Sequence, residues 1–308
     1  MNVSCDRHEE TGYAWRGIAP HWGISMQLSQ DTGGYMNDRL AIDEGTAYGK
    51  TPAQFDAELT QVGPGTPCGE FMRRYWLPIY LSKNVSQRPV NVRVLGEDLI
   101  LFRDGRGRPG LLHPRCAHRG TTLYYGKVDD AGIRCCYHGW QFDVEGRCID
   151  QPCEPGNGTH RDNVRQPWYP LEERYGLVFA YLGPLDKKPL LPRWDILENL
   201  GPGEKIHADA SSGFKIGGAG GENSPLEINP CNWLQDYENI MDPFHVPILH
   251  VSHSGRGGGF APTFAIMPKV TLAYTELGVQ YSAHRDLEDG GVLDRISVGM
   301  FPCVQSVP

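Results

Sequence analysis

The sequence predicts an α+β protein, with a small antiparallel β domain followed by a second domain that holds helices and further strands. The chain has 308 residues, which is enough for two domains. From about residue 80 to 185 apolar residues alternate with polar ones, a period of two that is typical of half-buried strands. A stretch rich in Pro and Gly follows from 186 to 230 and marks the boundary between the domains.

Four segments follow one another along the chain. Residues 1–52 are polar, dotted with glycine and without a sustained period, so we expect a mobile N-terminal extension. Residues 53–79 form a helical lead-in, with helix signals at 52–59 and 69–76. The β domain occupies 80–185, and the second domain occupies 186–308.

Short strands separated by turn residues account for the β domain. Val90, Val92 and Val94 alternate with polar residues, Gly96-Glu97-Asp98 is expected to turn, and the apolar run 99–102 follows. We expect further strands at 132–134, 140–144 and 177–182, with turns at 145–146 and 183–184.

Composition excludes several classes of protein. The formal charge of −8 argues against a nucleic-acid surface and is compatible with docking a basic face of an electron donor. No apolar run approaches membrane-spanning length, and the N-terminus lacks the basic and apolar regions of a secretory signal, so we expect a cytoplasmic protein. Nine Cys, an odd number, favour metal ligation over a disulfide framework.

Two loops in the β domain contain the ligands of an iron-sulfur cluster. Cys116-x-His118 is followed, after sixteen residues, by Cys135-x-x-His138. In a Rieske 2Fe-2S centre one iron takes two Cys and the other takes two His, so each loop supplies one ligand of each kind. The neutral imidazoles raise the reduction potential into a window of roughly −150 to +300 mV, which suits an electron relay.

Two alternatives concern these loops. A structural Cys2His2 zinc site uses the same four ligands, although zinc fingers usually place two Cys in one knuckle and two His in the other. Cys136 could replace Cys135 as the ligand, but Cys135 gives the C-x-x-H spacing. Rieske proteins of cytochrome complexes join an extra Cys in each loop as a disulfide. Because the first loop has no second thiol, the pattern favours the oxygenase type.

A second group of candidate ligands lies between Asn232 and His250. A mononuclear iron that activates dioxygen needs two His and one carboxylate on one face, and His245 and His250 can be the two His. On a straight α-helix residues five apart point about 140° away from each other, so we expect Pro247 to break the helix between them. Asp242 lies one helical turn before His245, where its carboxylate can orient that imidazole.

With both groups of residues identified, the chain resembles the large (alpha) subunits of Rieske non-heme iron aromatic-ring-hydroxylating oxygenases, especially the phthalate dioxygenase-like and O-demethylase branch. The resemblance runs from about Leu59 to Pro308. It includes the segments 62–67, 73–76 and 95–99, both loops, Gly183-Pro184 and the stretch from Asn232 to His250.

The resemblance implies a β domain with the cluster and a catalytic domain in which a curved antiparallel sheet wraps around helices, commonly in a homotrimer. By motif, the cluster ligands are Cys116, His118, Cys135 and His138, and His245 and His250 bind the mononuclear iron. Asp242 is then the catalytic residue that links His245 to His138 of the partner subunit. Electrons come from NAD(P)H through a separate reductase or ferredoxin, and with O2 they hydroxylate or O-demethylate an aromatic compound.

One departure from the family pattern concerns the third iron ligand. In the family this is an Asp far beyond the His pair, and only 308 − 250 = 58 residues follow His250. Asp286, Asp289 and Asp294 are present, but the sequence around 286–291 reads as a hairpin turn. We therefore expect the ligand beyond Pro308 and a truncated catalytic domain. A Rieske protein that only relays electrons, and a truncated oxygenase that holds only the cluster, remain alternatives.

Overall fold

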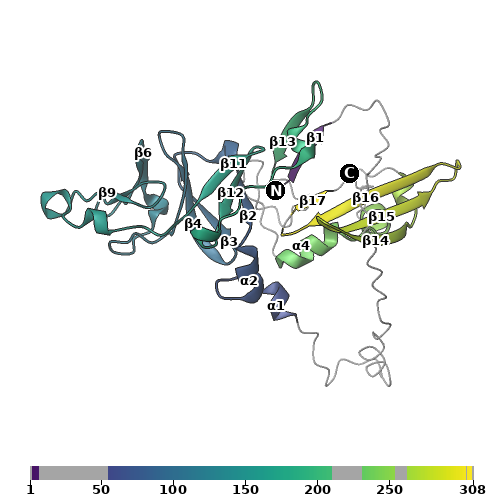
Figure 1. Ribbon diagram of the computed structural model, residues 1–308, viewed down its shortest axis with the longest axis horizontal. Helices are drawn as coiled ribbons and strands as arrows, with labels where there is room; N and C mark the ends of the chain where they lie inside the picture. The colour runs from purple at the N-terminus through teal and green to yellow at the C-terminus, as the bar shows by residue number, and fades with distance from the viewer. Residues whose placement is uncertain (1, 7–54, 210–230, 254–261, 303, 307–308) are drawn as a thin grey trace, which may run out of the picture. The chain divides into compact units, whose positions relative to one another are not determined.

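The computed structural model describes residues 2–6, 55–209, 231–253, 262–302 and 304–306 (Figure 1). Apart from the pairing strand described below, the predicted extension over 1–52 lies outside these residues, and so do the Gly-rich segments at 217–221 and 255–259. Among the described residues no helix is long and apolar enough to cross a membrane.

Three antiparallel sheets form the region predicted as the β domain (Figure 1). The first is ordered β11-β12-β2, the second β10-β5-β4-β3 and the third β6-β7-β8-β9. Their strands are β2 (Trp76–Leu81), β3 (Val90–Val94), β4 (Glu97–Arg103), β5 (Pro109–Leu112), β6 (Lys127–Asp129), β7 (Gly132–Arg134), β8 (Gln141–Phe142), β9 (Cys148–Asp150), β10 (Trp168–Tyr169), β11 (Leu171–Arg174) and β12 (Leu177–Tyr181).

Strand β4 connects two hydrophobic cores because both of its faces are buried. Leu99 and Leu101 pack in the core formed with β2, β3 and β12. Ile100 and Phe102 point to the opposite face and join the core around the two Cys loops. The continuous apolar run 99–102 is therefore required by burial on both sides. The core under the loops contains Cys116 and Cys135 themselves, so the fold positions the candidate ligands directly.

The helices are short. They are α1 (Ala57–Thr60), α2 (Pro67–Met72), α3 (Asp195–Glu198) and α4 (Trp233–Ile240), with a π-helix, η6 (Val246–His253), after α4. Single 3-10 turns are η1 (Ser82–Asn84), η2 (Leu123–Tyr125), η3 (Pro155–Asn157), η4 (Arg161–Asn163), η5 (Leu185–Lys187) and η8 (Pro262–Ala265). Asn232 caps α4, because its side-chain oxygen accepts a hydrogen bond from the Leu234 backbone N–H at 3.0 Å.

A further antiparallel sheet, β14-β15-β16-β17, follows the π-helix. Its strands are β14 (Lys269–Thr275), β15 (Gly278–Asp286), β16 (Val292–Met300) and β17 (Val304–Ser306). The β15–β16 connection at 287–291 is the predicted hairpin turn, in which the Gly291 N–H donates to Asp289. A separate two-stranded sheet pairs β1 (Asn2–Asp6) with β13 (Lys205–Asp209), a pairing that no pattern in the sequence predicts.

Several local predictions were wrong at their boundaries. The second helix ends at Met72, and Trp76 starts strand β2 instead of ending a helix. The turn between β3 and β4 is Leu95-Gly96, so Glu97 and Asp98 belong to the strand. The helix predicted over 52–59 begins only at Ala57 in the structure and ends at Thr60. Residues 52–54 lie outside the described part.

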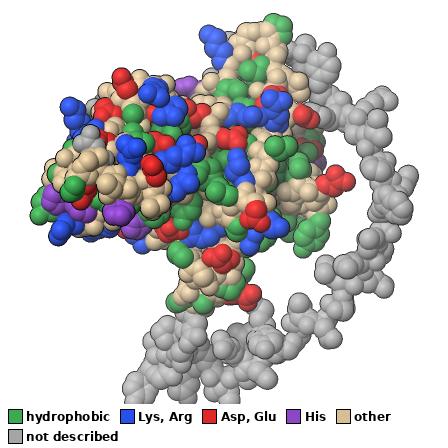
Figure 2. All heavy atoms as spheres, turned by 60° about the vertical axis from the view of Figure 1, so that its left-hand side comes forward, with side chains coloured by type: hydrophobic (Ala, Val, Ile, Leu, Met, Phe, Trp, Pro, Cys, Tyr) green, Lys and Arg blue, Asp and Glu red, His purple; other side chains and the backbone are tan. Residues whose placement is uncertain are grey.

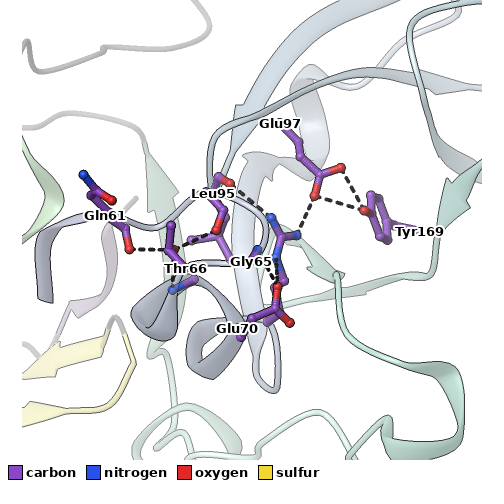
Figure 3. Close-up of polar contacts among 10 residues, drawn as sticks. Gln61, Gly65, Thr66, Glu70, Leu95, Glu97 and Tyr169 are labelled. Atoms are coloured by element: carbon purple, nitrogen blue, oxygen red, sulfur yellow. Dashed lines mark hydrogen bonds and ion pairs between the residues drawn. The ribbon is translucent and has the colours of Figure 1, made fainter. Parts of the chain in front are cut away.

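A polar network joins the C-terminal end of α2 to two strands (Figure 3). Arg73 is 5% exposed and forms an ion pair with Glu97, which also accepts a hydrogen bond from the Tyr169 hydroxyl at 2.8 Å. Arg73 also donates to the Leu95 carbonyl at 3.2 Å. Burial, and then the hydrogen bond to Glu97, raise the pKa of Tyr169 to about 12. The network therefore fixes α2 on the β3–β4 turn and on β10.

Candidate metal centres

The two Cys loops have the same backbone hydrogen bonds. In the first loop the Cys116 N–H donates to Thr121 O at 2.9 Å and the Gly120 N–H donates to Cys116 O at 2.9 Å. In the second loop the Cys135 N–H donates to Trp140 O at 2.8 Å and the Gly139 N–H donates to Cys135 O at 3.1 Å. The chain turns back with positive φ at both glycines, 71° and 74°, which explains why glycine occupies these positions.

These paired turns bring the four predicted ligands together. The His118 and His138 rings lie 4.7 Å apart between centroids. Cys116 and Cys135 are 3% and 4% exposed. Burial and the neighbouring Cys135 raise the pKa of Cys116 to about 11, while burial, followed by His138 and Arg119, lowers the pKa of His118. These groups suit a metal site. A metal would bind the two buried Cys side chains as thiolates and the neutral imidazole through its free ring nitrogen.

Side chains outside the motif hold each loop in place. Gln166, which is fully buried, accepts a hydrogen bond from the Ala117 N–H at 2.8 Å. Its amide nitrogen donates to the carbonyls of His113 and Arg115 at 2.8 and 2.7 Å. Arg134 holds the second loop, because its guanidinium donates to Gly139 O at 2.7 Å and to Asp150 at 2.6 Å. No motif in the sequence pointed to Gln166.

The surroundings of the loops fit a cluster whose atoms can accept hydrogen bonds. The Trp140 indole ring stacks on His118, with centroids 4.4 Å apart and planes 3° apart. The Trp140 Nε1 atom is buried and has no hydrogen-bond acceptor in the described part of the protein. An unpaired buried donor next to four candidate ligands fits a group whose sulfide atoms accept hydrogen bonds.

The two thiols of the second loop differ in exposure. Cys135 packs in the core beside Cys116, whereas Cys136 is exposed. Within the described ranges no three His, Cys, Asp or Glu side chains converge on a single ion position. The burial of Cys135 beside Cys116 supports Cys135 as the ligand of the second loop.

The second candidate site lies after α4, which ends at Ile240, and at the start of the π-helix, which begins at Val246. The Nε2 atoms of His245 and His250 are 3.1 Å apart, and their rings meet edge to face with centroids 5.0 Å apart. Two nitrogens on adjacent positions of one ion, each bound at about 2.1 Å, would lie about 3 Å apart. Burial, and then His245, lower the pKa of His250, which keeps its imidazole available as a ligand.

The expected helix break at Pro247 does not occur. His245 is helical and the π-helix runs from Val246 to His253 without interruption. Hydrogen bonds from residue i to i+5 widen the helix, so residues five apart lie one above the other on the same side. The α-helical geometry used for the prediction was therefore wrong, and the wider helix brings the two His together.

Asp242 lies beside His245 without bonding to it. Its Oδ2 is 3.6 Å from the His245 Nδ1, which is too long for a hydrogen bond. That Nδ1 is buried and has no hydrogen-bond partner among the described residues. The other carboxylate oxygen accepts from the Phe244 N–H at 2.8 Å, so a tight turn holds Asp242 in position.

The three downstream Asp residues face other partners. Asp286 pairs with Lys269 at 2.8 Å and with His284 at 3.0 Å, and Asp294 contacts the other ring nitrogen of His284 at 2.7 Å. Asp289 belongs to the β15–β16 turn. The described residues thus bring together two His and the nearby Asp242, with no further carboxylate converging on the pair.

Comparisons with known proteins agree with this geometry. The Rieske 2Fe-2S domain family matches residues 75–167. Phenoxybenzoate dioxygenase subunit alpha from Ectopseudomonas oleovorans is 56% identical over 86% of this chain and 63% of its own length. A tert-butanol monooxygenase / tert-amyl alcohol desaturase oxygenase subunit from Aquincola tertiaricarbonis is 39% identical over 83% of this chain and 55% of its own length. The chain thus spans less than two thirds of these relatives.

The fold has a counterpart among solved structures. The crystal structure of dicamba monooxygenase bound to dicamba superposes with a TM-score of 0.53 at 20% identity, covering 74% of this chain and 63% of that one. At this identity the likeness concerns the fold alone, and it confirms the predicted α+β class.

The loops and the matched domain together define a Rieske 2Fe-2S protein. As predicted from its motifs, the chain is similar over most of its length to oxygenase subunits of this kind, with a Rieske domain inside the matched region. The matched domain supports the predicted 2Fe-2S cluster, and the mononuclear iron remains a prediction. The individual ligands remain predictions, which the geometry above supports.

Proposed function

We propose that this chain is the oxygenase component of a Rieske system that uses NAD(P)H-derived electrons and O2 to hydroxylate or O-demethylate an aromatic compound. The main support is the 3.1 Å separation of the His245 and His250 Nε2 atoms in a chain that also carries a Rieske domain. A protein that only relays electrons has no use for such a pair. The 56% identity to a relative named phenoxybenzoate dioxygenase favours an aryl ether acid as substrate.

Each residue has a defined role in this proposal. Cys116, His118, Cys135 and His138 hold the cluster, which supplies one electron at a time when bound. His245 and His250 would hold the mononuclear iron, which when bound supplies open positions for dioxygen and substrate. Asp242, 3.6 Å from His245, would connect that residue to His138 of the partner subunit in a homotrimer, so the electron path would cross between chains.

Turnover of the full-length protein tests this proposal. The protein would be supplied with NADH, a Rieske-system reductase or ferredoxin, 18O2 and a phenoxybenzoate. We expect labelled oxygen in the product, and His245→Ala should abolish product formation while the signal of the reduced cluster persists. A matched control is His207→Ala, because His207 lies on β13 and is 59% exposed. Unchanged turnover in His245→Ala, or loss of the cluster signal, would contradict the assignment.

A second candidate function concerns the third iron ligand. Because no carboxylate converges on the His pair among the described residues, the 308 residues alone could bind the cluster without turning over. Iron analysis distinguishes the two cases: about three irons per chain indicate both centres, and about two indicate the cluster only.

The assembly and location are also proposals. We expect a homotrimer in the cytoplasm. Sedimentation equilibrium of the full-length protein tests the trimer, and a monomer at all concentrations would contradict the role given to Asp242 between subunits.

A further inference from the structure

A third loop, Gln151 to Glu154, contacts residues of both cluster loops. The Cys153 Sγ donates a hydrogen bond to the backbone carbonyl of His138 at 2.9 Å. Pro152 packs against Gly139, where an added Cβ would come within 2.8 Å of the Pro152 side chain. The Glu154 N–H donates to the Gln151 carbonyl at 3.0 Å. These contacts to His138 and Gly139 hold the backbone that leads to Glu154 against the second cluster loop.

The carboxylate of Glu154 faces a ligand from the other loop. Its Oε1 lies 3.8 Å from the Nε2 of His118, and the two side chains are 36% and 17% exposed. Stacking on Trp140 fixes the plane of the His118 ring. Because Nε2 faces Glu154, the other nitrogen, Nδ1, is left for the cluster. Histidine side chains lie at the surface of this part of the protein, with Lys and Arg side chains nearby (Figure 2).

We propose that Glu154 is a positioning residue that holds a negative charge against His118 and thereby lowers the reduction potential of the cluster. Reduction adds one electron, and a nearby carboxylate disfavours that added negative charge. A carboxylate near the outer nitrogen of a metal-bound His also makes the imidazole a stronger donor, which favours the oxidised metal. The inference depends on the cluster and not on oxygenase activity.

His118 and His138 would then have different environments. His138 is the histidine that the family pattern connects to Asp242 of the partner subunit. His118 instead lies near the Glu154 carboxylate of the same chain. The loop that holds Glu154 also contacts His138 through Cys153. The contribution of Glu154 to the potential would thus be present in each chain before any partner subunit docks.

A redox titration of Glu154→Gln, followed by circular dichroism or electron paramagnetic resonance, tests this inference. At a fixed potential the reduced-to-oxidised ratio should rise two- to threefold, the size expected of one exposed charge within about 8 Å in water. For a one-electron couple this is a shift of about 18 to 28 mV upward, at 59 mV per tenfold change. The shift should shrink toward zero at about 1 M salt, where the screening length is about 3 Å.

The matched control is Glu172→Gln. Glu172 is 38% exposed and lies 3.7 Å from Lys188, so it has nearly the same exposure and contact distance but faces no cluster ligand. We expect no shift in this variant, and a potential close to wild type in Glu154→Asp, which keeps the charge. An unchanged spectrum in Glu154→Gln shows that the ligands stay in place. No upward shift in Glu154→Gln, or an equal shift in Glu172→Gln, would overturn the inference.

Discussion

At the scale of single residues, the second Cys loop offers two thiols for one ligand position. Cys135 is buried against Cys116, and Cys136 is exposed two residues before His138. We therefore expect Cys135→Ser to abolish the absorbance and resonance signals of the cluster, and Cys136→Ser to leave both unchanged. Loss of the cluster in Cys136→Ser with retention in Cys135→Ser would reverse the ligand assignment.

Gln166 is the residue whose role is most difficult to see in the sequence. Its amide serves three backbone groups of the first loop at 2.7 to 2.8 Å, and replacing it leaves these groups unpaired. We expect Gln166→Leu to lower the free energy of unfolding by about 2–4 kcal/mol, measured by urea denaturation. The exposed Gln87 provides the control, since Gln87→Leu should change stability by less than about 0.5 kcal/mol. Equal effects in the two variants would contradict this role.

At the scale of elements, the two glycines of the cluster loops differ in their surroundings. Both have positive φ, but an added Cβ at Gly120 meets nothing within 4 Å, whereas at Gly139 it meets Pro152 at 2.8 Å. Gly120→Ala should cost about 1 kcal/mol, the usual cost of a left-handed residue with a side chain. Gly139→Ala should cost more, because Pro152 must move. Denaturation of both variants measures the difference, and a larger loss for Gly120→Ala would contradict the close packing.

The elements also show what could be predicted from the sequence. Alternation located β3, and the apolar runs located β4 and β12, because burial dictates these patterns directly. The spacing of Cys and His located both candidate sites. The π-helix could not be predicted, since no propensity distinguishes it from an α-helix and the expected break at Pro247 was wrong. Gln166 was missed because it lies about fifty residues from the loop that it holds.

At the scale of the whole molecule, the network of Arg73, Glu97 and Tyr169 makes stability depend on pH. The pKa of Tyr169 is raised from 10.0 to about 12 in the folded protein. A raised pKa stabilises the fold below the unfolded value, and this contribution is lost as the pH rises from about 10 toward 12. Tyr169→Phe should therefore be less stable than wild type at about pH 8, and the difference should shrink as the pH rises above about 10. Denaturation at several pH values measures it, and a difference that is constant with pH would contradict the role of the phenol.

The proposed function of the protein requires a 2Fe-2S cluster in the mixed Cys and His loops. Iron and acid-labile sulfide analysis of the purified protein, combined with electron paramagnetic resonance of the reduced form, measures this identity. Two irons and two sulfides per cluster, with the spectrum of a reduced Rieske centre that disappears in Cys116→Ser, are predicted. Bound zinc without sulfide, or the spectrum of an all-cysteine ferredoxin, would contradict the central claim.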